Sequence, residues 1–234
     1  MYEMNIRVRY SETNQHGEVE AYQILDYFQD SSVFHTMSLG LGLGKKEEED
    51  NAWYLLAWDI RIKDYPKLGD ELKVVTKPYK MKGFYGYRRF YLYDSNNNLI
   101  ADADSVWVYM NTKQSVPSKI PDDITKTYIP EEIKETVRVK RKLSSDGNWE
   151  EAEAFDVTGF FVDTNMHVNN AFYVQWAEEL LKDGEKPSAI RVEYRHSAFL
   201  KDCIHIFISK EEDIFKVKFE NQKKELLAII EMTL

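Results

Sequence analysis

The chain has little cysteine, glycine or proline and no long apolar run. Its 234 residues include one cysteine, Cys203, with Gly 10 and Pro 6. A single cysteine excludes an intrachain disulfide framework and a cysteine-rich metal cluster, and it fits a reducing compartment. No apolar segment approaches the length of a membrane span, and residues 1–10 lack the apolar core of a secretory signal. We therefore expect a cytoplasmic protein without a membrane span.

Positive charge is also scarce, since 31 lysines and arginines face 40 acidic residues for a net charge of -9. This deficit excludes a general nucleic-acid binder, which needs excess basic residues to displace counterions from phosphates. One stretch departs from the trend: five basic residues and no acidic residue lie between positions 77 and 89. They are Lys77, Lys80, Lys82, Arg88 and Arg89. The stretch is either a charge-protected strand edge or a docking surface for an acidic partner.

A weak internal repeat indicates two related halves. Glu12-Thr13-Asn14-Gln15-His16 resembles Asp163-Thr164-Asn165-Met166-His167 at a displacement of 151 residues, from position 16 to position 167. A β-like stretch precedes each copy (residues 5–10 and 155–162), and an apolar stripe of helical period follows it, at Ala21, Ile24, Leu25 and Phe28 and at Tyr173, Trp176, Ala177, Leu180 and Leu181. Further strand-like segments are residues 60–62, 89–93, 105–110, 190–192, 204–208, 215–219 and 226–234.

Each half thus reads as a strand, a helix and several more strands. Such a helix can bury its apolar stripe only against the sheet, which predicts an α+β fold with a helix packed on an antiparallel sheet in each half. Residues 117–148 are charged and contain three prolines, Pro117, Pro121 and Pro130. We place an inter-domain linker at residues 131–150, between an N-terminal domain of residues 1–130 and a C-terminal domain of residues 151–234.

The second copy of the repeat combines the groups needed for acyl hydrolysis. In extended geometry Asp163, Asn165 and His167 would share one face, just before a predicted helix. The free backbone N–H groups at a helix start can polarise a carbonyl oxygen. The alternative is structural: Asn169 or Asn170 caps the helix and His167 is merely hydrogen-bonded.

The segment Asp163-Thr164-Asn165-Met166-His167-Val168-Asn169-Asn170 resembles the signature of plant and bacterial acyl-ACP thioesterases. Arg88-Arg89-Phe90, residues 105–111 and residues 117–121 resemble the N-terminal half of the same family, so the likeness spans nearly the whole chain. The resemblance implies a tandem (double) hotdog fold. It also implies release of free fatty acids from acyl-[acyl carrier protein], which terminates fatty acid synthesis. No spacing of residues in the sequence implies a metal or an organic cofactor.

The resemblance also assigns site residues by position. Those expected to be catalytic are Asp163, Asn165 and His167, and those expected to bind substrate are Asn169, Asn170 and Trp107. A further glutamate of the family falls at Ser197, which departs from the family pattern. Either Ser197 replaces it by holding a water, or another residue, an acid such as Glu193, takes its role. The nucleophile is either a water or the Asp163 carboxylate. The acyl carrier protein is expected to dock on the five basic residues between positions 77 and 89.

Several alternatives stay open. The chain could hydrolyse acyl-CoA, or it could be a non-catalytic acyl- or lipid-binding hotdog module. His16 is a relic of the duplication or lines the pocket. Gly40 to Lys46 is read as a helix stop and loop instead of a phosphate-binding loop, because it follows a helix. The protein is expected to be a monomer of two joined halves or a homodimer of such chains.

Overall fold

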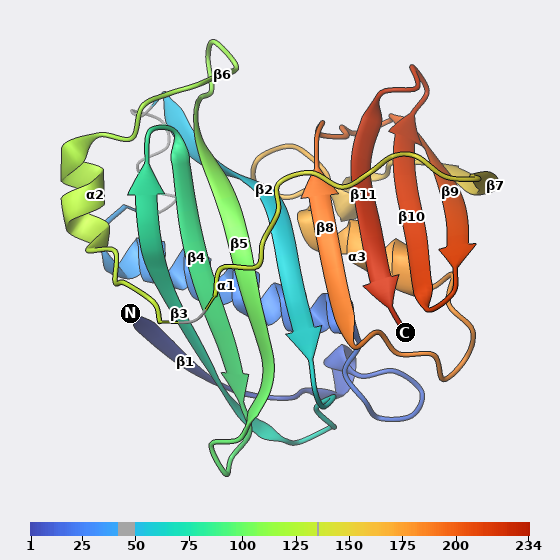
Figure 1. Cartoon of the computed structure of the whole chain (residues 1–234), viewed down its shortest axis with the longest axis horizontal. Coiled ribbons are helices and arrows are strands. Elements are labelled where there is room, and N and C mark those ends of the chain that lie inside the picture. The colour runs from blue at the N-terminus through green and yellow to red at the C-terminus, as the bar shows by residue number, and fades with distance from the viewer. Residues whose placement is uncertain (42–49, 135) are drawn as a thin grey trace.

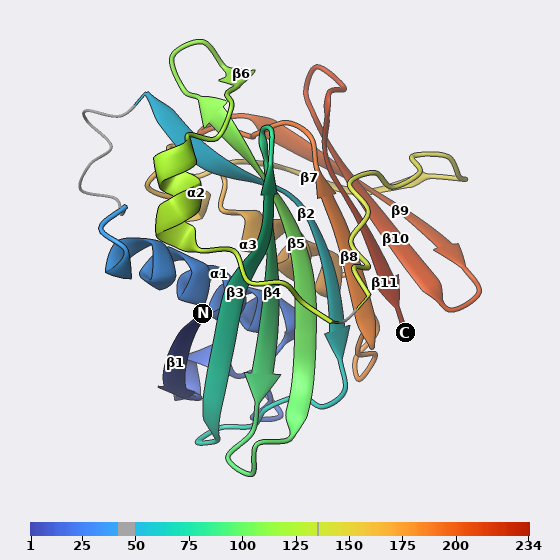
Figure 2. The ribbon, with the colours of Figure 1, turned by 60° about the vertical axis from the view of Figure 1, so that its left-hand side comes forward.

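A computed structural model describes residues 1–41, 50–134 and 136–234. One antiparallel sheet runs through the molecule, and the two longer helices lie on one face of it (Figures 1 and 2). The helices are α1 Ala21–Ser38, α2 Asp122–Tyr128 and α3 Asn170–Glu178. The strands are β1 Tyr2–Arg7, β2 Asn51–Ile62, β3 Glu71–Lys82, β4 Tyr85–Tyr93, β5 Leu99–Asn111, β6 Val116–Pro117, β7 Glu150–Asp156, β8 Ala189–Tyr194, β9 Cys203–Glu211, β10 Ile214–Asn221 and β11 Leu226–Thr233.

The sheet joins the two halves of the chain. Its strand order is β1-β3-β4-β5-β2-β8-β11-β10-β9-β7, with β6 paired to β5. The junction is the antiparallel pair β2 and β8, in which Trp58 lies opposite Val192 and Asp59 opposite Arg191. Each half therefore supplies one long helix and its own part of the sheet, which is the tandem hotdog arrangement that the sequence predicts.

The predicted apolar stripes make the core. In α1, the side chains of Ile24, Leu25 and Phe28 are fully buried, and the Phe28 ring packs on the rings of Trp58 and Phe90. In α3, Tyr173 and Trp176 pack against Phe219 of β10. The second helix is shorter than its stripe suggests, because Leu180 and Leu181 lie beyond its end at Glu178.

Two predicted strands have other bounds in the structure, and one strand was not predicted. The first strand covers residues 2–7 and not 5–10, and β7 ends at Asp156, followed by a 3-10 turn at Gly159–Phe161. Strand β3 was not among the predicted strands, although its last residues, from Lys77, lie in the basic stretch that was interpreted as a possible strand edge. The proline is accommodated because the pairing of β3 with β4 shifts register between Pro78 and Lys80, and a bulge can hold a residue without an N–H donor.

The stretch between the halves is mostly exposed, but a few contacts hold it against the protein. Helix α2 ends at the buried Tyr128, and the chain then crosses the face of the sheet opposite α1 and α3 (Figure 1). There Arg138 binds Asp59 at 3.2 Å and Asp102 at 2.7 Å, and the backbone N–H of Leu143 donates to Glu193. We call this face, which carries the crossing segment, the outer face, and the face under the helices the inner face. The division at residues 130 and 150 stays a prediction.

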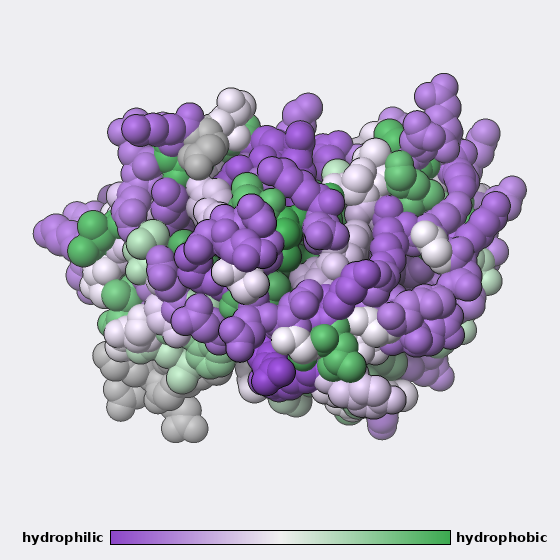
Figure 3. All heavy atoms as spheres, turned by 90° about the horizontal axis from the view of Figure 1, so that it is seen from below, coloured by the Kyte–Doolittle hydropathy of each residue, from purple (hydrophilic) through white to green (hydrophobic). Residues whose placement is uncertain are grey.

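The face of the molecule seen in Figure 3 is mainly hydrophilic, with separate hydrophobic patches between the charged side chains. Within the described ranges, none of the helices has the length and apolar character needed to cross a bilayer.

Helix α1 is capped by the other half of the chain. Its own N-cap residue, Glu20, makes no capping hydrogen bond with its side chain. Instead, the carboxylate of Glu178 on α3 accepts hydrogen bonds from the backbone N–H groups of Ala21 at 2.8 Å and Tyr22 at 2.7 Å. The carboxyl group of Glu178 thus satisfies two free amides of the helix start, although burial raises its pKa to about 8.

We expect Glu178→Ala to lower the free energy of unfolding by about 2 kcal/mol, because it leaves two amides without their acceptor. Urea unfolding followed by circular dichroism measures the change. Glu179→Ala is the matched control, since Glu179 is exposed on the same helix end and should cost much less. Equal stabilities of the two variants would show that the cap contributes nothing.

Candidate active site

A cavity of about 1040 Å³ lies between the helices and the inner face of the sheet. Its walls come from both halves: α1, β2, β4 and β5 of the first half, and residues 162–165, 167–170, 194–197 and 199 of the second. The volume is at the upper end of the range for small-molecule pockets. The described part of the chain thus contains one space large enough for a long apolar ligand, shared between the two halves.

The motif around Asp163 forms a tight turn at the wall of this cavity. Val162 pairs with Val168 across the turn, the N–H of Asp163 donates to the His167 carbonyl at 2.9 Å, and the N–H of Met166 donates to the Asp163 carbonyl at 3.0 Å. Met166 has a φ of 66°, which closes the turn. The expectation of an extended segment was therefore wrong, and the polar side chains meet because the chain reverses.

Asp163, Asn165 and His167 all line the cavity. The backbone N–H and side-chain amide of Asn165 donate to the two carboxylate oxygens of Asp163, at 2.6 and 3.0 Å. The His167 ring packs between the rings of Tyr54 of β2 and Phe199, at centroid distances of 5.6 and 5.7 Å. The turn thus holds a carboxylate, an amide and an imidazole at one place, and the first half of the chain helps to position the imidazole.

The capping interpretation of the motif is also correct, and it coexists with the cavity. Asn169 is the N-cap of α3, and its side-chain oxygen accepts from the N–H of Ala171 at 3.1 Å and from Gln29 of α1 at 3.2 Å. Asn169 and Asn170 both line the cavity. The start of α3, with the positive end of its dipole, therefore faces the same space as the turn.

The other predicted site residues fall in different places. Trp107 lines the cavity from β5 and donates to Ser105 at 2.7 Å, and Ser197 lines it from the loop after β8. Glu193 does not line the cavity, because its carboxylate is on the outer face, where it binds the N–H of Leu143 and the guanidinium of Arg195. A glutamate that the sequence did not single out, Glu225 in the turn before β11, lies at the cavity wall, and nothing in its polar turn indicated this.

The first-half copy of the motif folds in the same way, but two residues out of the predicted alignment. Thr13 pairs with Val19 as Val162 does with Val168, and Gly17 has a φ of 73° where Met166 has 66°. The structural displacement is therefore 149 residues, from position 18 to position 167, and not 151. Glu18 is the counterpart of His167, and His16 is the counterpart of Asn165.

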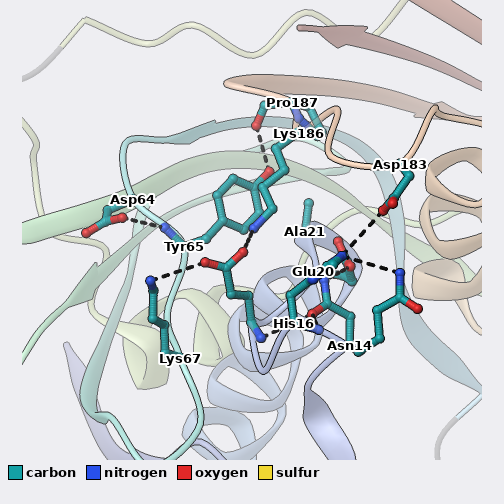
Figure 4. Close-up of polar contacts among 12 residues, drawn as sticks. Asn14, His16, Glu20, Ala21, Asp64, Tyr65, Lys67, Asp183, Lys186 and Pro187 are labelled. Atoms are coloured by element: carbon teal, nitrogen blue, oxygen red, sulfur yellow. Dashed lines mark hydrogen bonds and ion pairs between the residues drawn. The ribbon is translucent and has the colours of Figure 1, made fainter.

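Ion pairs occupy this first turn (Figure 4). Glu18 binds Lys67 at 3.3 Å and also Lys186 of the second half, and these hydrogen bonds, the one from Lys186 first, lower the pKa of Glu18. The exposed His16 lies 3.4 Å from Asp183. The first turn therefore holds the two halves together, and the interpretation of His16 as pocket-lining was wrong, because His16 does not line the cavity.

The predicted basic surface is only partly a surface. Arg88 and Arg89 are buried on opposite faces of β4, with exposed fractions of 6% and 3%. Arg89 binds Asp102 at 2.6 Å and Asp104 at 2.7 Å on the outer face, whereas Arg88 points toward the inner face, beside His35. Both were wrong as docking residues, because alternate side chains of a strand point to opposite faces and each face here is covered. Lys80 and Lys82 remain exposed and Lys77 is half-buried.

Comparison with known proteins agrees with this architecture along the chain. The family description "Acyl-ACP thioesterase N-terminal domain" matches residues 1–128, and "Acyl-ACP thioesterase C-terminal domain" matches residues 144–232. An acyl-[acyl-carrier-protein] hydrolase of Cuphea viscosissima is 28% identical over 193 residues, covering 76% of this chain and 47% of that protein. The chain spans about half the length of the curated relatives it matches.

Two solved structures share the fold over almost the full chain. A putative oleoyl thioesterase from Lactobacillus plantarum superposes with a TM-score of 0.87 at 20% identity, covering 100% of this chain and 96% of that one. An acyl-ACP thioesterase from Bacteroides thetaiotaomicron gives 0.85 at 18% identity, covering 99% and 96%. This chain is thus a tandem hotdog protein in which only the second of the two described turns carries the Asp163, Asn165 and His167 motif. On the family matches, the chain belongs to the acyl-ACP thioesterase family.

The ion pairs of Glu18 predict a pH-dependent contribution to stability. Its folded pKa lies below the ordinary 4.5, so the stabilisation is present above pH 4.5 and is lost as the pH falls through the folded pKa. We expect Glu18→Gln to be less stable than wild type at pH 7 by no more than about 1 kcal/mol, since these pairs are partly exposed. Urea unfolding at pH 7 and pH 3 measures the difference, which should be smaller at pH 3. An equal difference at both values would contradict the assignment.

Proposed function

We propose that this protein hydrolyses fatty acyl groups from acyl carrier protein. The observation that carries the proposal is that one cavity of about 1040 Å³ has the turn of Asp163, Asn165 and His167 in its wall. A large cavity suits a long acyl chain. The turn places groups capable of acid and base catalysis where the thioester of that chain would lie. The names of the related proteins support hydrolysis of this kind.

In the proposed mechanism the thioester carbonyl lies at the start of α3, where the helix dipole stabilises the developing negative charge on oxygen. The turn contains no cysteine or serine that could act as the nucleophile. Attack by a water is then a simpler mechanism than attack by the Asp163 carboxylate. Asp163 or His167 removes the proton of the attacking water as it adds to the carbonyl carbon. The thiol then leaves with a proton, and the fatty acid is released.

Asn165 has a positioning role in this mechanism. Its two hydrogen bonds fix both oxygens of the Asp163 carboxylate. Ser197 and Glu225, at the same cavity wall, are the candidates for holding the water in place of the family glutamate. Glu193 is not a candidate, because its carboxylate faces away from the cavity.

The proposed partner is an acidic carrier protein that docks on the hairpin of β3 and β4. Lys77 and Lys80 lie over the rings of Tyr91 and Tyr87, at 5.8 and 5.5 Å, and Lys82 lies at the hairpin tip. Met81 and Tyr87 line the cavity, so this hairpin borders it. A basic edge beside the cavity suits an acidic partner whose thioester must reach the turn.

A cytoplasmic location is part of the proposal, supported by the single unpaired cysteine, Cys203. Hydrolysis of acyl-CoA is the alternative activity, and turnover of one acyl chain on both carriers separates the two. A homodimer remains a prediction, which light scattering tests.

We expect His167→Ala and Asp163→Asn each to lower kcat by about 100-fold or more, the usual scale for losing an acid or base group. Steady-state hydrolysis of an acyl-ACP measures the change, and circular dichroism checks the fold. His16→Ala, a histidine change in the first turn, is the control and should retain most of the activity, because its side chain lies outside the cavity. Full activity of His167→Ala would eliminate the catalytic assignment and favour a lipid-binding module.

Reversing charge at the hairpin should weaken carrier docking. We expect the double variant Lys80→Glu and Lys82→Glu to raise KM for acyl-ACP, more at low salt than at high salt, and to leave a small thioester unaffected. The control is Lys63→Glu with Lys182→Glu, two exposed lysines outside this hairpin. If KM rises equally for both kinds of substrate, or equally in the control, the hairpin is not the docking site.

A further inference from the structure

One side chain of the first half bonds to the start of α3 at the wall of the cavity. The residues of α1 that line the cavity are Gln29, Ser32, Val33, Thr36 and Met37. The hydroxyls of Ser32 and Thr36 donate to carbonyls of their own helix, at 2.8 and 2.9 Å. Gln29 differs from them, because its Nε2 donates to Oδ1 of Asn169 in the second half, at 3.2 Å. A hydrogen bond between the two halves therefore lies two residues beyond His167 of the motif turn.

This bond fixes the orientation of the Asn169 amide. Oδ1 of Asn169 also accepts from the backbone N–H of Ala171 at 3.1 Å, as the N-cap of α3. An amide oxygen accepts through two lone pairs that lie in the amide plane. Two donors on Oδ1 therefore hold that plane, whereas one donor alone leaves the amide free to turn about a single hydrogen bond.

The amide nitrogen of Asn169, Nδ2, is the donor that this arrangement leaves available. Within residues 1–41, 50–134 and 136–234, no acceptor is bonded to it, and it is not enclosed, in contrast to Oε1 of Gln29. Asn169 lines the cavity at the start of α3. Nδ2 can thus donate to a group bound in the cavity at the place where the proposed mechanism puts the thioester carbonyl.

The bond from Gln29 is a poor way to stabilise the fold. Oε1 of Gln29 is buried and has no hydrogen-bond partner in the described part of the chain. A buried acceptor without a partner costs more free energy than one hydrogen bond usually returns. Methionine has a similar length and would avoid that cost. The contact between α1 and α3 is also held elsewhere, by the bonds from Glu178 to Ala21 and Tyr22.

We infer that Gln29 is a positioning residue of the proposed active site, which holds the Asn169 amide so that Nδ2 donates to the carbonyl oxygen of the bound thioester. As a water adds to the carbonyl carbon, negative charge develops on that oxygen. A donor that is fixed beforehand stabilises this charge without having to reorient. The first half of the chain then acts on the chemistry itself, through α1. The inference rests on the proposed function, because it concerns a step of the hydrolysis.

The main test is Gln29→Met, which removes the donor and keeps the length of the side chain. We expect kcat for acyl-ACP to fall by about 10- to 100-fold with KM nearly unchanged, because the oxygen carries its charge only in the transition state. The midpoint of urea unfolding should not fall below that of wild type. Gln23→Met, on the same helix but outside the cavity, is the matched control and should change neither kcat nor KM. A folded Gln29→Met variant with the kcat of wild type overturns the inference.

A second substitution tests whether Gln29 acts through Asn169. Asn169→Ser keeps an N-cap oxygen for α3 but removes Nδ2, so kcat should fall by about 100-fold or more. In that background Gln29→Met should lower kcat by less than about 3-fold further, because the group that it positions is absent. Neither substitution should change the shape of the pH profile of kcat, since neither side chain transfers a proton. If the two losses multiply in full, Gln29 does not act through Asn169 and the inference fails.

Gln29→Ala keeps the test decisive if methionine packs poorly at this position. Alanine is the best helix former and occupies less space, and it should lower kcat as methionine does. If both variants lose stability and activity together, Gln29 is only a structural contact between the helices and the inference falls.

Turnover by the wild type separates this inference from the proposed function. If the wild type hydrolyses neither acyl-ACP nor acyl-CoA, the proposed function fails, and the role of Gln29 in it fails with it. If the wild type hydrolyses acyl-ACP and both Gln29 variants keep its kcat, only the role of Gln29 is refuted.

Discussion

The pairing of β2 with β8 is the interaction on which the rest of the structure depends. It makes one sheet from two halves, and its register decides which side chains face the helices. Trp58 and Val192 are opposite each other on the inner face, whereas Asp59 and Arg191 face the crossing segment. A slip of one residue would exchange the two sets. The same pairing sets Tyr54 of β2 against His167, so the proposed catalytic turn takes its position from this junction.

The sequence predicted the features that local patterns control. Both long helices were identified from their apolar stripes, at Ile24, Leu25 and Phe28 and at Tyr173 and Trp176. Apolar residues recur every 3.6 positions where a helix buries one face. The motif at Asp163 was recognised as a whole, and the structure brings its polar groups together at one cavity. The turn that brings them together was not predicted. Methionine rarely adopts a positive φ, so its presence at position 166 gave no indication of a turn.

Features that depend on packing were not predictable in the same way. Arg88 and Arg89 look equivalent in sequence, but one faces a cavity and the other an acidic cluster, and only the sheet register separates them. The repeat was found but misaligned by two residues, because the alignment matched the two histidines, His16 and His167. The backbone hydrogen bonds, which the sequence does not show, relate Glu18 to His167. The role of Glu178 also needs the folded chain, since the helix it caps lies more than a hundred residues away.

The two motif turns share a hydrogen-bonded frame but have different contents. The first binds the halves together through Glu18 and Lys186, and the second places its polar groups at the cavity. In a symmetric dimer of identical subunits, every substitution would occur in both copies of the turn. A substitution that exchanged a catalytic residue for one that joins the subunits would therefore remove both active sites. One polypeptide with both halves removes that constraint. Each turn can then change independently, and synthesis itself fixes their ratio at one to one, so the assembly never depends on the concentration of free subunits.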